Sequence, residues 1–239
     1  MSARSGSLQP QQQLLDAPAY PIAEAARLVG LSSGQARRWL RGYEFEYLTK
    51  AHPKVRRSQK PPVVPRGLTR EATYVSFLDL IDLLLVRQFL AEGFTLQQLR
   101  TVFAEAKRRL EVQHLAYQTF FTIGRRVFLE IDDASIVALL SGGQLAIDKF
   151  IRELGHQIEF DEETKLAIRW YPLHPDRNVV IDPYVSFGHP VIAGTRITTS
   201  NVLDFFQAEN RKIDLVCDWM GIKPQAAESA ISFESQLAA

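Results

Sequence analysis

Cysteine is almost absent from this chain of 239 residues, in which Cys217 is the only example. One thiol excludes an internal disulfide framework and a cysteine-rich metal site, and it fits a reducing, cytoplasmic setting. The histidines lie far apart and show no metal-ligand spacing; they are His52, His114, His156, His174 and His189. We therefore predict neither a metal ion nor another cofactor.

Long hydrophobic runs are also missing. The most apolar stretch, Phe77 to Val86, is interrupted by Asp79 and Asp82, whereas a membrane-spanning helix needs roughly 20 apolar residues. The N-terminus shows no apolar core of a signal peptide, and residues 1–19 are polar enough to predict a disordered tail. The sequence has no nucleophile elbow, phosphate-binding loop or paired-carboxylate motif, so we do not expect an enzyme.

Net charge is small, at +1, but the charged residues are sorted along the chain. Ten cations and only two acidic residues lie between Gly34 and Arg70, whereas nine acidic residues and three cations lie between Glu130 and Lys165. This segregation favours two surfaces with different partners, although two solvated faces would give the same pattern.

Residues 20–43 predict two short helices joined by a tight turn. Gly30 can close the first helix, and Ser32 or Ser33 can cap the second, in which Trp39 belongs to the apolar face and is expected in the core. Two such helices, the second one basic, form the helix-turn-helix pattern of DNA-binding proteins. The residues that we expect to face DNA are Ser33, Gln35, Arg37, Arg38 and Arg41.

A wing is predicted after these helices. Prolines at 53, 61, 62 and 65 forbid a helix, and residues 63–64 are expected to pair with 73–75 as two short strands. Four cations would then lie at or near the tip, where they could reach phosphates; they are Lys54, Arg56, Arg57 and Lys60. Two helices follow, over 77–93 and 95–110, and the second begins at a capping threonine.

With these features, residues 20–110 resemble the MerR-like regulators, which combine a helix-turn-helix, a wing and a helix pair around a Gly-Phe-Thr-Leu type of turn. The matching residues are Tyr20, Ala26, Gly30, Ser32, Arg37, Trp39, Tyr74, Gly93, Phe94, Leu96 and Leu99. The resemblance implies that Arg37 contacts the DNA backbone. The chain departs from the family in lacking the cysteines that sense metals or oxidants, and in turning toward β structure after Leu110.

The segment 113–171 is expected to be a small β-rich region with one helix. Residues 120–132 are typical of a hairpin that turns at Gly124, and an amphipathic helix is expected to end at Gly155. Residues 157–160 and 165–171 predict a second strand pair joined by an acidic turn. This region could carry a dimer contact, and residues 172–178 have the composition of a linker.

Residues 179–239 predict two short strands followed by three helices. The strands, over 179–181 and 190–193, flank a turn at Gly188, and Thr198 or Thr199 caps a helix that runs to about Glu209. Two further helices are predicted over 213–220 and from Pro224 to about Leu237. Six carboxylates against three cations between Thr198 and Ala239 disfavour a second DNA-binding surface.

The string from Ile181 to Thr198, IDPYVSFGHPVIAGTRIT, resembles a family of domains of unknown function that occurs in many bacterial antitoxins partnered with PIN-like ribonuclease toxins. The matching residues are Asp182, Pro183, Gly188, Pro190, Val191, Ile192, Gly194, Thr195, Arg196 and Ile197. The resemblance implies that Gly194, Thr195 and Arg196 contact the toxin, with Arg196 presented to the acidic metal site of the nuclease. The alternative is a structural role, in which Gly194 makes the turn, Thr195 caps it and Arg196 pairs with Asp182.

The sequence as a whole predicts an α+β fold, mostly α. It comprises a winged helix-turn-helix over 20–112, a small β-containing middle region over 113–171, the linker 172–178, and a C-terminal three-helix, helix-turn-helix-like unit over 179–239. The predicted function is a Vap-type antitoxin, a repressor that neutralises a PIN-like ribonuclease toxin and binds its own operator DNA. A homodimer, with no membrane partner, would place helix 32–41 of each subunit in successive major grooves. The alternative is a MerR-like regulator that senses a ligand and has no toxin partner.

Overall fold

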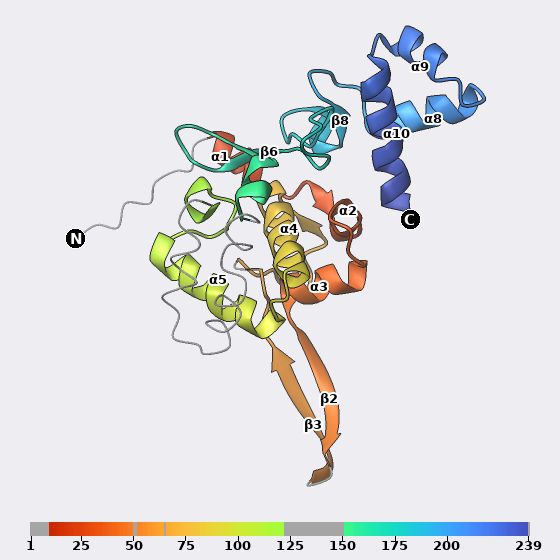
Figure 1. Ribbon diagram of the computed structural model, residues 1–239. Helices are drawn as coiled ribbons and strands as arrows, with labels where there is room; N and C mark the ends of the chain where they lie inside the picture. Colours follow the sequence, from red (N-terminus) through yellow and green to blue (C-terminus); the bar gives the residue numbers. More distant parts are fainter. Residues whose placement is uncertain (1–9, 50–51, 65, 122–150, 239) are drawn as a thin grey trace. The chain divides into compact units, whose positions relative to one another are not determined.

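The computed structural model describes residues 10–49, 52–64, 66–121 and 151–238, and the chain forms two compact units (Figure 1). The N-terminal unit comprises Tyr20–Ile151, and the C-terminal unit comprises Arg152–Ala239 together with the residues up to Ala19. Helices dominate both units, and the sheets in the described part are two-stranded. The expected mixture of helices and small sheets is therefore confirmed.

The N-terminal unit begins with two helices in contact. Helices α2 (Ile22–Leu28) and α3 (Ser33–Arg41) are joined by a turn at Gly30, whose φ of 67° favours glycine. The Ser32 hydroxyl accepts a hydrogen bond from the Gln35 amide at 3.2 Å, and Gln35 Oε1 accepts one from the Ser32 amide at 3.1 Å. This capping box satisfies amides that the first turn of a helix leaves unpaired, and it confirms the predicted start of the second helix.

A long hairpin follows, and its pairing differs from the prediction. Strands β2 (Tyr43–Thr49) and β3 (His52–Lys60) are antiparallel, and they extend away from the helices of their unit (Figure 1). The expected pairing of 63–64 with 73–75 is wrong, because β4 (Tyr74–Val75) pairs with β1 (Tyr20–Pro21). The amides of 63 and 64 donate instead to the Trp39 carbonyl, which the end of α3 would otherwise leave unpaired.

The next two helices agree with the prediction. Helix α4 (Phe77–Ala91) starts at a capping box of Ser76 and Asp79, and α5 (Leu96–Leu110) starts at one of Thr95 and Gln98. Most of α4 is buried, and its Phe89 ring packs edge-on against three other rings of the core; these are Phe94, Phe103 and Phe120. Residues 118–121 are helical, so the start of the hairpin expected over 120–132 is wrong, and the remainder of that hairpin lies outside the described residues.

In the C-terminal unit, two parts differ from the prediction. Residues 10–16 form helix α1 (Pro10–Asp16), with Leu15 buried, where a disordered tail was expected. The expected linker 172–178 makes specific contacts: Asp176 and Asn178 both hydrogen-bond to Ser229, and the Arg177 guanidinium lies 3.7 Å from the centre of the Tyr171 ring. These side-chain contacts hold the segment in place, which its turn-rich composition does not predict.

The remaining elements of the C-terminal unit follow the predicted order. Strands β5 (Ile158–Phe160) and β6 (Ala167–Trp170) are paired, as are β7 (Val179–Val180) and β8 (Val191–Ile192). A 3₁₀ turn, η1 (Ser186–Gly188), precedes β8. Helices α8 (Thr199–Ala208), α9 (Ile213–Met220) and α10 (Pro224–Ala238) surround an apolar core that includes Val202, Val216 and Ala227. The Thr198 cap of α8 is confirmed.

None of the helices in the described ranges combines the length and the apolar character that crossing a membrane requires.

Candidate functional site

The residues expected to face DNA divide into exposed and anchored side chains. Arg37 and Arg38 are exposed on α3, whereas Trp39 is buried in the core, as expected. Gln35 is exposed, but its side chain also completes the capping box with Ser32, and Ser33 is half-buried. A neighbouring pair of exposed arginines on one short helix suits contact with phosphates.

Arg41 makes a structural contact within the N-terminal unit. Its Nη2 donates a hydrogen bond to the Ala72 carbonyl, and the side chain is half-buried. This bond joins the end of α3 to the segment before β4. Arg41 therefore has a structural contact within its own unit, and its contact with DNA stays a prediction.

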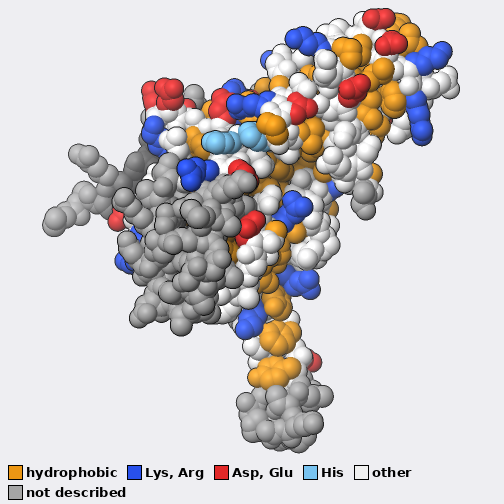
Figure 2. Space-filling view, viewed as in Figure 1, with side chains coloured by type: hydrophobic (Ala, Val, Ile, Leu, Met, Phe, Trp, Pro, Cys, Tyr) orange, Lys and Arg blue, Asp and Glu red, His pale blue; other side chains and the backbone are white. Residues whose placement is uncertain are grey.

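The positions of the cations on the hairpin differ in part from the prediction. Arg57 is exposed and forms an ion pair with Glu46 on the opposite strand, with 2.9 Å between Nε and Oε1. Lys60 pairs in register with Tyr43 at the base of the hairpin, so its predicted place near the tip is wrong. The side chains of Lys54 and Arg56 lie outside the described residues. Hydrophobic side chains run along the hairpin on the face seen in Figure 2, with cations at its base.

Strand β2 carries a ladder of aromatic rings. Tyr43, Phe45 and Tyr47 alternate with glutamates along β2, and consecutive ring centroids lie 5.9 and 5.8 Å apart. Rings at alternate positions share one face of a strand and stiffen a hairpin that is otherwise only two strands wide. The alternation of aromatic residues with glutamates is visible in the sequence and is a signal for this strand that the prediction missed.

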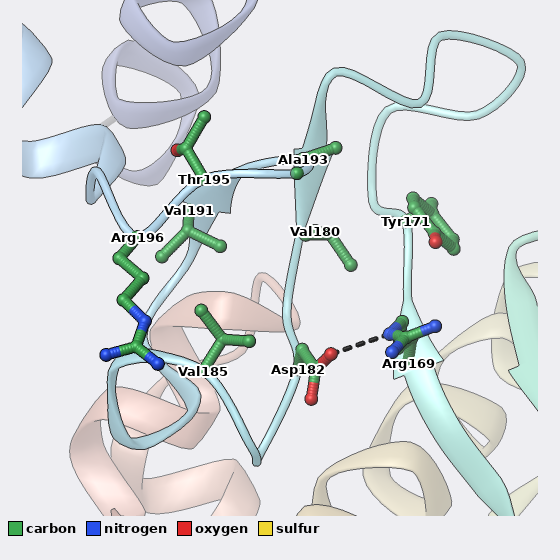
Figure 3. Close-up of a pocket in the computed structure, with 10 residues that line it drawn as sticks. Arg169, Tyr171, Val180, Asp182, Val185, Val191, Ala193, Thr195 and Arg196 are labelled. Atoms are coloured by element: carbon green, nitrogen blue, oxygen red, sulfur yellow. Dashed lines mark hydrogen bonds and ion pairs between the residues drawn. The ribbon is translucent and has the colours of Figure 1, made fainter. Parts of the chain in front are cut away.

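In the C-terminal unit, the predicted toxin-contact residues border a pocket of about 500 Å³ (Figure 3). Its lining comprises Arg169, Tyr171, Val180, Asp182, Val185, Val191, Ala193, Gly194, Thr195 and Arg196. The two strands β7 and β8 supply its apolar wall, and β6 supplies Arg169. The sequence did not predict that Arg169 and Tyr171, from the middle region, would meet the 194–196 turn in one pocket.

The 194–196 turn is built by Gly194 and Thr195. Gly194 has a φ of 78° and open space around it, so glycine is favoured there by backbone conformation and not by crowding. The Thr195 hydroxyl donates to the Ile192 carbonyl at 2.9 Å and accepts from the Ile197 amide at 3.0 Å. Both residues therefore have the structural role that was one of the two alternatives.

Arg196 does not have the structural role proposed for it. Asp182, its expected partner, is buried and accepts from Arg169 Nε at 2.6 Å, while its other oxygen accepts from the Tyr184 amide at 2.8 Å. The Asp182 bond is also the main reason that the pKa of Arg169 is raised. Arg196 lies across the pocket from this pair (Figure 3), and among the described residues its guanidinium has no hydrogen-bond or ion-pair partner.

Two exposed aromatic side chains lie in the loop that contacts Arg196. The Ser186 hydroxyl donates to the Arg196 carbonyl at 3.1 Å, which ties η1 to the 194–196 turn. Phe187 is 90% exposed and Tyr184 is 45% exposed, and Phe187 has a left-handed φ of 57°, which is rare for a bulky residue. An exposed ring held in a strained backbone conformation is a functional signal that the sequence pattern did not provide.

Comparisons with known proteins agree with the C-terminal assignment. Residues 179–233 match the family described as "Protein of unknown function (DUF433)". Over 227 residues the chain is 23% identical to "Putative antitoxin VapB45" of Mycobacterium tuberculosis strain H37Rv, covering 90% of this chain and 93% of the relative. It is also 23% identical over 231 residues to "Uncharacterized protein Rv2308" of the same strain, covering 92% and 91%. The chain is thus distantly related to an antitoxin-like protein along most of its length.

A solved structure shares the fold. The X-ray crystal structure of Rv2018 from Mycobacterium tuberculosis aligns with a TM-score of 0.68 and covers 91% of this chain and 98% of that one, at 20% sequence identity. At this identity the likeness concerns the fold alone.

Proposed function

We propose that this protein is the antitoxin of a type II toxin–antitoxin system, acting by binding and not by catalysis. The C-terminal unit holds a PIN-like ribonuclease toxin, and the N-terminal unit, a MerR-like winged helix-turn-helix, represses the operator as a homodimer. The relationship to an antitoxin-like protein along most of the chain supports the general role. The exposed guanidinium of Arg196, which has no hydrogen-bond or ion-pair partner in the part of the chain that the structure describes, is the observation that carries the assignment of the toxin-contact surface.

The chemistry of this surface suits a nuclease. A PIN-like toxin has an acidic metal site, and a guanidinium forms charge-assisted, two-pronged hydrogen bonds with carboxylates. Arginine and aromatic residues are also the side chains that contribute most of the binding energy in protein interfaces. Arg196 lines the pocket, and the exposed Phe187 and Tyr184 lie in the loop that Ser186 ties to the 194–196 turn, so the C-terminal unit supplies this combination of side chains.

Co-expression tests the proposal. The tagged chain is produced together with the product of the small reading frame beside its gene, and a stable complex that restores growth is expected. Arg196→Ala should weaken the complex by about 2 kcal/mol or more, as for a central interface arginine. Arg211→Ala, an exposed arginine in the turn after α8, is the matched control and should bind as the unchanged chain does.

A complex that is unaffected by Arg196→Ala would move the contact elsewhere on the C-terminal unit. If nothing co-purifies and the neighbouring product is harmless, the antitoxin role is wrong. The chain is then better described as a MerR-like repressor that responds to a ligand.

A further inference from the structure

Three buried side chains of the N-terminal unit gather at one place, although the sequence shows no metal-ligand spacing. Asp79 and Asp82 lie three residues apart on α4 and therefore share one face of that helix. His114 reaches the same place from the segment after α5. The three residues are 0%, 1% and 3% exposed, respectively.

The distances between these side chains are those of a ligand set. His114 Nδ1 lies 2.9 Å from Asp82 Oδ2 and 3.8 Å from Asp79 Oδ1, and one ligand atom of each residue lies within 4.8 Å of the others. Two ligands that each lie about 2.0–2.1 Å from a tetrahedral zinc ion are roughly 3.3 Å apart. The two distances from His114 Nδ1 bracket that value, and all three atoms lie within 4.8 Å of one another, so side-chain shifts could bring them onto one ion.

Asp79 provides a second, independent observation. Its Oδ2 accepts from the Ser76 amide at 2.9 Å and from the Ser76 hydroxyl at 3.0 Å, and Arg66 lies 3.5 Å away. Its Oδ1 is fully buried and has no hydrogen-bond donor among the described residues. A buried carboxylate oxygen without a donor is costly, and native proteins seldom leave one without an ion or water. This oxygen lies toward His114 Nδ1.

The outer contacts hold the ligand atoms in place. Asp82 Oδ1 accepts from the Leu115 amide at 2.8 Å, which leaves Oδ2 directed to the His114 ring. The capping box fixes the Asp79 carboxylate in the same way through its other oxygen. Second contacts of this kind orient the ligands of protein metal sites.

We propose that Asp79 Oδ1, Asp82 Oδ2 and His114 Nδ1 bind a divalent transition-metal ion of the zinc class. Two carboxylates and one imidazole form a set of nitrogen and oxygen donors that suits Zn²⁺, and it balances the charge of two buried acids. The ion ties the segment after α5 to α4, and α4 packs against α3. Metal binding therefore stabilises the unit that carries the proposed DNA-reading helix, whether or not the protein has a toxin partner.

The test uses the full chain, stripped with a chelator and dialysed. Titration with ZnCl₂ followed by calorimetry should give one tight site, and the thermal unfolding midpoint should rise with Zn²⁺ concentration. Co²⁺ provides a readout on the unchanged chain, because its visible absorption reports a bound ion with nitrogen and oxygen ligands and no thiolate.

Variants locate the site. His114→Gln should lower the affinity for Zn²⁺ by more than about 100-fold, because loss of an outer contact alone costs about 10–100-fold. Asp82→Asn keeps the shape of the side chain and its bond from Leu115 but removes a charged ligand, so it should act in the same direction. His189→Gln, an exposed histidine in the other unit, is the control and should leave the affinity unchanged.

Three results would overturn the proposal. One is an unchanged chain that binds no Zn²⁺ in the titration and shows no Co²⁺ spectrum. Another is tight binding that survives both His114→Gln and Asp82→Asn in variants that remain folded by circular dichroism. The third is a loss of affinity in His189→Gln equal to that in His114→Gln, which places the ion elsewhere.

Discussion

At the scale of single residues, Gly42 shows why one position between α3 and the hairpin admits no side chain. Its φ of 73° and ψ of −176° belong to a region open almost only to glycine. A Cβ at this position would lie 2.4 Å from the Lys60 carbonyl oxygen, which is backbone and cannot move aside. Gly42 therefore allows the chain to leave α3 directly into β2.

Gly42→Ala should destabilise the protein by about 2–3 kcal/mol, because backbone strain and a backbone clash add together. Gly34→Ala is the matched control, since Gly34 lies inside α3 with nothing near its Cβ position. Replacing a helical glycine by alanine should stabilise by about 0.5–1 kcal/mol. Urea unfolding of both variants measures the difference; equal stabilities would refute this account of Gly42.

The residue scale also shows what the sequence could not provide. The apolar place of Trp39 follows from the local pattern of its helix, and it is observed. The partner of Asp182 does not follow, because Arg169 lies on a different strand in a segment that was assigned to another region. Contacts between distant segments are fixed by packing. Such contacts leave no periodic pattern in the sequence, so they cannot be predicted from it in the way that helices and strands can.

At the scale of elements, the bond between Asp182 and Arg169 joins β6 to the segment that follows β7. Arg169 also reaches Glu159 on β5 at 2.6 Å, so one guanidinium connects three neighbouring segments. Asp182 is buried, and a buried carboxylate that loses its cation keeps its desolvation cost.

Arg169→Met should therefore destabilise the protein by about 3 kcal/mol. Arg177→Met is the control, because this exposed arginine lies 3.6 Å from the same glutamate and its ion pair should contribute less than about 1 kcal/mol. Thermal and urea unfolding compare the two. Similar losses of stability in the two variants would mean that the burial of Asp182 does not explain how much its bond to Arg169 stabilises the protein.

Element boundaries were predictable where capping residues and breakers mark them. Helix α9 was expected over 213–220 and observed there, since Gly221 follows it in a left-handed conformation and Pro224 opens the next helix. Prolines and cations, by contrast, predict the hairpin too late in the chain, because the strands begin at Tyr43 and the prolines at 61 and 62 follow β3. The alternation of Tyr43, Phe45 and Tyr47 with glutamates was the informative signal.

The basic elements of the N-terminal unit make a prediction about salt. If Arg37 and Arg38 contact phosphates, the double variant Arg37→Ala/Arg38→Ala should reduce the slope of log affinity for operator DNA against log salt by about 1.8, that is, about 0.9 for each contact. Arg108→Ala should leave the slope unchanged, because Arg108 is paired with Glu105 at 2.6 Å. Fluorescence anisotropy over a series of salt concentrations provides the slopes.

The hairpin is tested separately. Arg56→Ala/Arg57→Ala should also reduce the slope, although Arg57 shares its charge with Glu46 and its contribution is expected to be smaller than that of Arg37. An unchanged affinity and an unchanged slope would show that the hairpin does not reach phosphates.

At the scale of the whole molecule, the two units separate the two proposed binding functions. The exposed cations of α3 belong to the N-terminal unit, and the pocket with Arg196 belongs to the C-terminal unit. Each unit has its own buried core. Substitutions on one surface should therefore leave the fold of the other unit intact.

This division predicts opposite effects of two sets of variants. Arg37→Ala/Arg38→Ala should lose operator affinity and still bind and neutralise the toxin, whereas Arg196→Ala should lose the toxin and still bind an inverted repeat whose half-sites lie about one helical turn apart. Both are measured on the same preparations, by anisotropy with operator DNA and by co-purification with the toxin. If either variant loses both activities, the two surfaces depend on each other, and the division of the two functions between the units is wrong.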